Sequence, residues 1–439
     1  MRKVLLTLIL ALGVGSVFAQ SGEDKAKAKA DAAALKVAQK EAKNQVKEAQ
    51  KIKDAIYLKI QEKTAQNPEI LSECKKGQEV LQKAIKSGLL DEDKLGENYK
   101  LSTELAMYPL NIMLEQASGK QPFDTLYFYD NLKCLTDGLH NELKYTKVTK
   151  GETGNEAQLK AKKIQLSQCG DYYIYAAQFE GSCKRYDRAI EAYDRALNYK
   201  TTYPEIADIC ELRISNPQIA YYAYHMAHEA KLYDVMDKYY DEAVQFAEGA
   251  EGTKQVKLAS YLERKDTVAW AKAAHDITLK EPSKNEDLIQ ILLAYYQKHG
   301  MDKMMAYADE VLAVDNNVLI ANYGKGYVYF AQEKYDEALA CYVKCTEIKP
   351  DYYDAWYQAG LCKFRQALAK NATISNIKNQ VKAKQTLEET KKLFGLAIPY
   401  FEKARECAPN EPQKWAYELK QCYSVTGQAA KAAEMDKLL

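Results

Sequence analysis

Two histidines three residues apart are the side chains of this sequence best placed to do chemistry. His225 and His228 belong to the stretch His225-Met226-Ala227-His228-Glu229, and residues at i and i+3 share one face of a helix. A metal ion could therefore reach both rings. Because the sequence specifies no third ligand, it favours histidines that line an ordinary binding surface, and we expect no metal site.

Motifs of the common catalytic and nucleotide-binding sites are absent from the sequence. The chain contains no Walker loop, no GxGxxG, no GxSxG and no HExxH, the patterns that hold phosphates, expose a nucleophile or bind catalytic zinc. Acidic pairs such as Asp241-Glu242 are interpreted as solvated helix surface. We therefore expect a protein that is not an enzyme and that uses no cofactor.

Tyrosine dominates the aromatic content, with 34 tyrosines against 9 phenylalanines. A tyrosine offers a large rigid contact area and a hydroxyl, which suits recognition surfaces. Tyrosines also fill the seams between packed helices, and we expect that role for Tyr186, Tyr193, Tyr240, Tyr329 and Tyr342. For the other tyrosines both binding and packing stay open.

The most regular stretch of the chain, residues 319–352, predicts two antiparallel helices. The first spans about 319–332 and the second about 335–348, where Lys349-Pro350 ends it because proline cannot continue a helix. Small residues face large ones at three- and four-residue steps, which lets two helices approach closely. The small positions are Gly326, Ala338 and Cys345, and the large ones are Tyr329 and Tyr342.

This order of residues resembles the tetratricopeptide repeat, whose period is about 34 residues. Asn322 departs from the family, which usually has Trp at that position. Equal steps place repeat starts at 217, 251, 285, 319 and 353, and the register holds without insertion into the first helix of the last unit. The resemblance implies an all-α fold, a right-handed superhelical array of antiparallel helix pairs, that is, a TPR-like α-solenoid.

Breaks at proline and glycine divide the rest of the chain. The Lys/Ala-rich helix before residue 66 is interpreted either as a solvated helix that packs along the array or as a partner-binding coiled-coil segment. Pro399 is expected to kink or restart its helix. The expected divisions are a signal peptide at 1–19, the basic helix at 20–66, a degenerate helical region at 67–169, a repeat-like unit with an insertion at 170–216, four contiguous repeats at 217–352, a repeat at 353–411 with a helical insertion at about 371–395, and capping helices at 412–439.

The N-terminus has the features of a secretory signal peptide. Arg2-Lys3 precedes an apolar run at 4–14, and Val17-Phe18-Ala19 is a small-residue cleavage site. The apolar run is too short to span a membrane, and no cysteine follows the cleavage site to carry a lipid anchor. We expect an exported protein, periplasmic or secreted, that is not membrane-spanning; peripheral association with the envelope is left open.

Charge and cysteine content narrow the partners further. With 62 basic and 61 acidic residues the chain carries no excess charge that would favour nucleic acid. Ten cysteines in an exported chain could form disulfides, but several occupy small positions within predicted helices. Buried free thiols are the favoured interpretation, and pairs drawn from the five cysteines before residue 211 stay open.

In the tetratricopeptide family the first helix of each pair lines a concave groove. The resemblance implies a partner surface made of Tyr221, Tyr222, His225, His228, Leu293, Tyr296, Tyr323, Tyr327, Phe330, Tyr357 and Phe364. The family's best-defined pocket grips a terminal carboxylate with Lys and Asn, and the matching positions here hold other residues, so that clamp is not expected.

Two functions remain for such a chain. Arrays of this family usually work as non-enzymatic scaffolds, so the first is an adaptor of the cell envelope that binds a protein or an extended peptide in the groove. The second is a glycan- or small-ligand-binding component of an envelope uptake system, since aromatic faces suit sugars.

Overall fold

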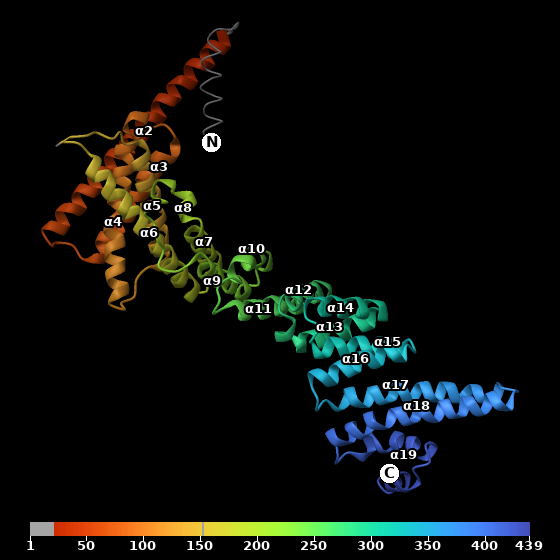
Figure 1. The fold of residues 1–439 in the computed structure, drawn as a ribbon. Coiled ribbons are helices and arrows are strands. Elements are labelled where there is room, and N and C mark those ends of the chain that lie inside the picture. The colour runs from red at the N-terminus through yellow and green to blue at the C-terminus, as the bar shows by residue number, and fades with distance from the viewer. Residues whose placement is uncertain (1–21, 152) are drawn as a thin grey trace. The chain divides into compact units, whose positions relative to one another are not determined.

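The structure is a computed structural model that describes residues 22–151 and 153–439 (Figure 1). The predicted signal peptide at 1–19 lies outside these described residues. The described residues form α-helices joined by turns and short 3-10 segments, without a β-strand among them, so the predicted all-α class is confirmed. The chain divides into two compact units, of which the first ends at Val256 and the second begins at Lys257.

Neighbouring helices pack in sequence order in the first unit. Breaks follow local chemistry: a proline lies in the first turn of the helix that begins at Asn67, and Gly88 ends that helix with φ 68°. Asp124 caps a later helix by accepting a hydrogen bond from the Tyr127 backbone N–H at 3.0 Å. The helices are α2 (Gly22–Gln61), α3 (Asn67–Ser87), α4 (Leu95–Ser118), α5 (Thr125–Tyr145), α6 (Glu156–Ser182), α7 (Tyr186–Leu197), α8 (Tyr199–Thr202), α9 (Asn216–Glu229) and α10 (Tyr233–Ala243).

The long helix α2 is anchored only along part of its length. Ala42, Ala49 and Ile56 are buried, and α2 packs against α3 and α4. Between residues 26 and 41 no side chain is buried. The apolar stripe is therefore a packing surface in the second half of the helix, where its residues meet a core.

The second unit contains five further helix pairs, the first of which begins within the first unit. The division between the units falls inside α11, the first helix of that pair. The helices are α11 (Ala250–Glu263), α12 (Thr267–Lys280), α13 (Glu286–His299), α14 (Met301–Val314), α15 (Leu319–Ala331), α16 (Tyr335–Ile348), α17 (Tyr353–Thr373), α18 (Gln380–Cys407), α19 (Ala416–Val425) and α20 (Ala429–Asp436). First helices of pairs thus begin at residues 216, 250, 286, 319 and 353, close to the spacing of the repeat.

A glycine lets the two helices of a pair approach in the second unit. A Cβ on Gly326 of α15 would lie 2.9 Å from Tyr342 Cε1 of α16, and one on Gly360 of α17 would lie 2.8 Å from Phe401 Cδ1 of α18. Both glycines therefore sit under an aromatic ring that leaves no room for a side chain. The Phe401–Gly360 contact is thus equivalent to the Tyr342–Gly326 contact. Many more residues lie between Gly360 and Phe401 than between Gly326 and Tyr342.

The residues around the predicted insertion lengthen both helices of their pair. α17 continues to Thr373 and α18 starts at Gln380. Of the two alternatives predicted at Pro399, a kink or a restart, the restart is wrong, because α18 runs without interruption to Cys407; the kink stays a prediction. Proline removes one backbone hydrogen bond there, and burial of Ala397, Ile398 and Phe401 around it outweighs that loss.

Four of the turns between paired helices share one backbone conformation. Lys184, Lys231, Lys265 and Glu333 end the first helices with φ between 57° and 61°. This left-handed conformation is unusual for a residue with a side chain. Its recurrence in both units means that the same turn joins helix pairs of regular and of degenerate sequence.

The ten cysteines carry free thiols in this structure. Cys74, Cys169, Cys345 and Cys422 are among those that are buried, and burial raises the pKa of each of these thiols to about 12. Such thiols stay protonated and act as small apolar core residues. Within the described residues, no helix combines the length and apolar content needed to cross a membrane.

Candidate functional site

The histidines singled out from the sequence lie on α9 of the first unit together with Tyr221 and Tyr222, and all four side chains are half-buried. The Tyr221 ring packs 4.3 Å from His225, and the Tyr222 ring stacks 6.2 Å from Tyr193 of α7. Burial, followed by the neighbouring His228, lowers the pKa of His225. The described residues contain no group of three His, Cys, Asp or Glu side chains that could hold a metal ion.

Two tyrosine hydroxyls join neighbouring first helices in the second unit. Gln297 Nε2 of α13 donates a hydrogen bond to the Tyr327 hydroxyl of α15 at 3.0 Å. The Tyr357 hydroxyl of α17 donates to Glu418 Oε1 of α19, also at 3.0 Å. Tyr327 is 38% exposed. We call Gln297, Tyr327, Tyr357 and Glu418 the first-helix face.

Leu293 and Phe364 belong to the core and not to a partner surface. They are 4% and 6% exposed, and Phe364 packs edge-on against Phe394 and Phe401 of the lengthened α18 at 5.4 and 6.1 Å. The assignment of both to the groove by register is therefore wrong. The apolar stripe of a helix spans about 100° or more, so positions at the margin of a groove can turn into the core.

The remaining predicted residues lie in seams between helices. The Tyr323 ring packs 5.4 Å from Tyr342 and 5.8 Å from Tyr352, and burial raises the pKa of Tyr323 well above its usual value. Phe330 packs 5.3 Å from Tyr335. The Tyr296 hydroxyl is 2.8 Å from His275 Nδ1 of α12. Of the predicted set in the second unit, Tyr327 is the exposed member, whereas Tyr357 is half-buried.

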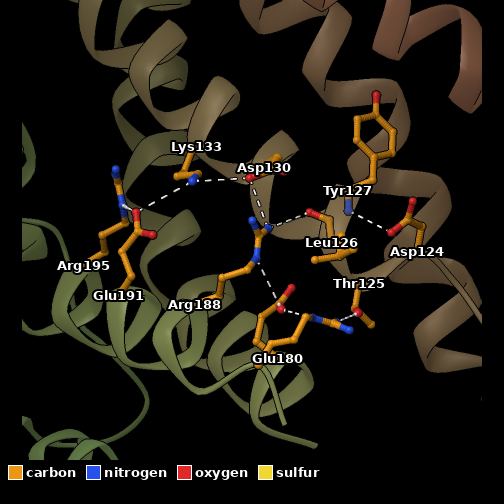
Figure 2. Close-up of polar contacts among 11 residues, drawn as sticks. Asp124, Thr125, Leu126, Tyr127, Asp130, Lys133, Glu180, Arg188, Glu191 and Arg195 are labelled. Atoms are coloured by element: carbon orange, nitrogen blue, oxygen red, sulfur yellow. Dashed lines mark hydrogen bonds and ion pairs between the residues drawn. The ribbon is translucent and has the colours of Figure 1, made fainter. Parts of the chain in front are cut away.

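A network of ion pairs that no sequence motif predicts joins α5, α6 and α7 (Figure 2). Glu180, at the end of α6, has no exposed surface and pairs with Arg185 and, at 3.4 Å, with Arg188 Nε. Arg188 Nη2 also donates to Asp130 Oδ1 and to the Leu126 carbonyl of α5, each at 3.1 Å. The buried carboxylate thus organises cations that hold α7 against α5.

The same network continues along α7. Lys133 Nζ lies 3.3 Å from Asp130 and 3.7 Å from Glu191, and Glu191 lies 3.4 Å from Arg195 Nε. Lys133 and Arg188 also face the buried Tyr129 ring, at 4.4 and 4.9 Å from its centroid. One local signal pointed here: Tyr-Asp-Arg occurs at 186–188 and again at 193–195, which puts two arginines on one helix face.

Comparison with known proteins supports the repeat assignment. Residues 326–366 match the family model described as TPR repeat, and this stretch contains the Gly326–Tyr342 contact, the whole of α16 and parts of α15 and α17. Residues 326–366 therefore contain a tetratricopeptide repeat, as the sequence pattern predicted for this stretch. No curated protein matches the chain.

Several solved structures are similar to parts of the chain. A crystal structure of MamA is 17% identical, covers 40% of this chain and 88% of its own, and superposes with a TM-score of 0.28. YrrB, described as a TPR protein with an unusual peptide-binding site, is 19% identical over 59% of this chain and 96% of its own, with a TM-score of 0.21. The TPR2AB domain of yeast Sti1 in complex with pHSP90 is 12% identical over 59% of this chain and 99% of its own, with a TM-score of 0.24. Scores this low carry no conclusion about what this chain binds.

Proposed function

We propose that the chain is a non-enzymatic interaction scaffold that binds a protein or an extended peptide across the first-helix face of the second unit. The observation that carries this proposal is the pair of cross-helix hydrogen bonds, Gln297 to Tyr327 and Tyr357 to Glu418. They hold tyrosine rings on the layer of first helices in fixed orientations. A ring held in advance loses little conformational freedom on binding, which favours affinity.

The scaffold is proposed to work in the cell envelope, periplasmic or secreted, after removal of residues 1–19. This part of the proposal rests on the sequence of the N-terminus. The mature protein should begin at Gln20, and mass spectrometry of the protein from the envelope and culture fractions tests this. Protein that retains Met1 and stays in the cytosolic fraction would overturn the location but not the binding surface.

Partner capture tests the surface itself. Tyr327→Ala should weaken retention of the partner while leaving the melting temperature nearly unchanged, because Tyr327 is partly exposed. Tyr57→Ala is a matched control, since Tyr57 of α2 is 49% exposed and its hydroxyl also accepts a hydrogen bond from a glutamine, Gln61 Nε2, at 2.6 Å. Equal loss of capture in both variants, or in neither, would contradict the assignment.

A glycan-binding function is favoured by a different feature of the second unit. Trp356 and Tyr400 lie 6.3 Å apart beside a cavity of about 490 Å³ that Leu396 and Pro399 also line. An aromatic wall of this kind suits the apolar face of a sugar ring. Titration of oligosaccharides while tryptophan emission is followed tests this second function, and Trp356→Ala should abolish any change that appears.

A further inference from the structure

A second cavity, in the first unit, has no role in the proposed function. It has a volume of about 450 Å³ and lies between α6, α7 and α8. Cavities of about 300–1,000 Å³ are typical of small-molecule sites. The residues that matter for its chemistry are Tyr173 of α6, Glu191, Asp194 and Arg195 of α7, Thr202 of α8, and Tyr203.

A hydrogen-bond donor with several N–H groups lines this cavity. Arg195 Nε lies 3.4 Å from Glu191 Oε1, at the long end of a hydrogen bond. The guanidinium group carries five N–H donors. It therefore suits a carboxylate.

Two acidic side chains of α7, Glu191 and Asp194, line the same cavity within one helical turn of Arg195. Asp194 accepts hydrogen bonds from Lys238 Nζ at 2.6 Å and from the Tyr239 hydroxyl at 3.1 Å, both through Oδ1. Glu191 likewise meets its cations through Oε1. The second oxygen of Asp194 takes part in neither of these bonds, and the two carboxylates together suit an ammonium group.

Two tyrosines supply the apolar part of the wall. The Tyr173 hydroxyl is 2.7 Å from the Thr136 hydroxyl, and the Tyr203 hydroxyl is 3.4 Å from Asp137 Oδ1. Both hydroxyls are therefore engaged away from the cavity, and the rings are fully or almost fully buried. Their positions are fixed before any ligand arrives.

We propose that this cavity binds a small zwitterion of the amino-acid type. Its carboxylate contacts Arg195, its ammonium group contacts Glu191 and Asp194, and its side chain lies along the wall at the exposed edge of Tyr203. A simple anion would face the two acidic side chains, and a simple cation would face Arg195. A molecule that carries an ammonium group and a carboxylate on the same carbon satisfies the two sets together.

Calorimetric titration of the full mature chain with each common L-amino acid tests the proposal. At least one should bind, and its amide, which lacks the carboxylate, and its N-acetyl form, which lacks the ammonium, should each bind at least about tenfold more weakly. If no amino acid binds, or if the amide and the N-acetyl form bind as tightly as the parent, the proposal is overturned.

Substitutions locate the binding. Arg195→Gln should abolish it, whereas Arg213→Gln, at an exposed arginine that contacts Asp171 and Tyr175, should leave it unchanged. If Arg195→Gln fails to fold, Thr202→Trp takes its place. Thr202 is an exposed lining residue, so a larger side chain there should fill the cavity and abolish binding. Undiminished binding by a folded Arg195→Gln or Thr202→Trp variant would overturn the proposal.

Discussion

The two units of this protein hold their helices together in different ways. In the second unit a glycine on the first helix lies under an aromatic ring of the second, as Gly326 does under Tyr342. In the first unit the seam between α5, α6 and α7 depends on the buried carboxylate of Glu180 and the arginines around it. Packing of a small residue under a large one can recur in every repeat. A buried ion pair, in contrast, joins one particular set of helices.

The largest effect is expected from Phe401, the aromatic ring that covers Gly360 in the lengthened pair of α17 and α18. Phe401→Ala should lower the free energy of unfolding by about 3–5 kcal/mol, because Phe401 is fully buried and its removal leaves a cavity. Gly360→Ala alone should also destabilise by about 1–3 kcal/mol through overpacking. In the Phe401→Ala background Gly360→Ala should cost less, since the added methyl group enters the vacated space. Denaturant unfolding of the four proteins measures this, and simple additivity would contradict the contact.

A smaller loss is expected from the ion pairs of the first unit. Glu180→Leu should destabilise by about 2 kcal/mol, below the 3–5 typical of a fully buried pair, because the side chains of Arg185 and Arg188 are 30% and 28% exposed and can hydrate in part. Asp336→Asn is the control in the second unit, at a carboxylate that is 73% exposed and pairs with Lys363. It should change stability by less than about 1 kcal/mol. Equal losses would remove the distinction between the units.

The difference between the units explains how far the sequence could predict the fold. Gly326, Ala338 and Tyr342 lie close together in the chain, so their spacing indicates both helices and the contact between them. Arg188 and Asp130 are 58 residues apart, and no local pattern pairs them. The repeat was therefore predictable from short-range spacing, while the ion pairs depend on a fold that the degenerate N-terminal sequence does not reveal.

The candidate surface was predictable only in part, for a related reason. Helical register predicts which side of α15 or α17 a residue occupies, but not how far a neighbouring helix covers it. Phe364 is covered because the insertion lengthens α18 and brings Phe394 against it. Tyr323 meets Tyr352 from the following turn. Among the described residues, a glutamine side chain is the one hydrogen-bond partner of the Tyr327 hydroxyl.

Substitutions of Tyr323 and Tyr327 should therefore distinguish a residue that packs between helices from one that is free to bind a partner. Tyr323→Ala should destabilise by about 2 kcal/mol, as expected for a half-buried seam residue, and Tyr327→Ala by less than about 0.5 kcal/mol. Thermal unfolding of the two single variants checks this. If Tyr327→Ala is the more destabilising of the two, Tyr327 belongs to the core and the first-helix face loses its exposed member.

The smallest effect is a gain of stability at the turns that both units share. Lys184→Gly in the first unit and Glu333→Gly in the second should each stabilise by up to about 1 kcal/mol, because φ values of 58° and 61° suit glycine better than a residue with a side chain. Chemical denaturation resolves a change of this size. A gain in only one unit would show that the turns, like the seams, differ between them.

Crosslinking in intact cells from a single photoreactive residue at position 327 tests the central claim most directly, with the same residue at position 57 as the reference. The claim predicts a discrete adduct with one protein or peptide from position 327, absent from position 57 and competed by an excess of the unmodified protein. Identical adducts from both positions, or none from position 327 in cells that contain the folded protein, would contradict it.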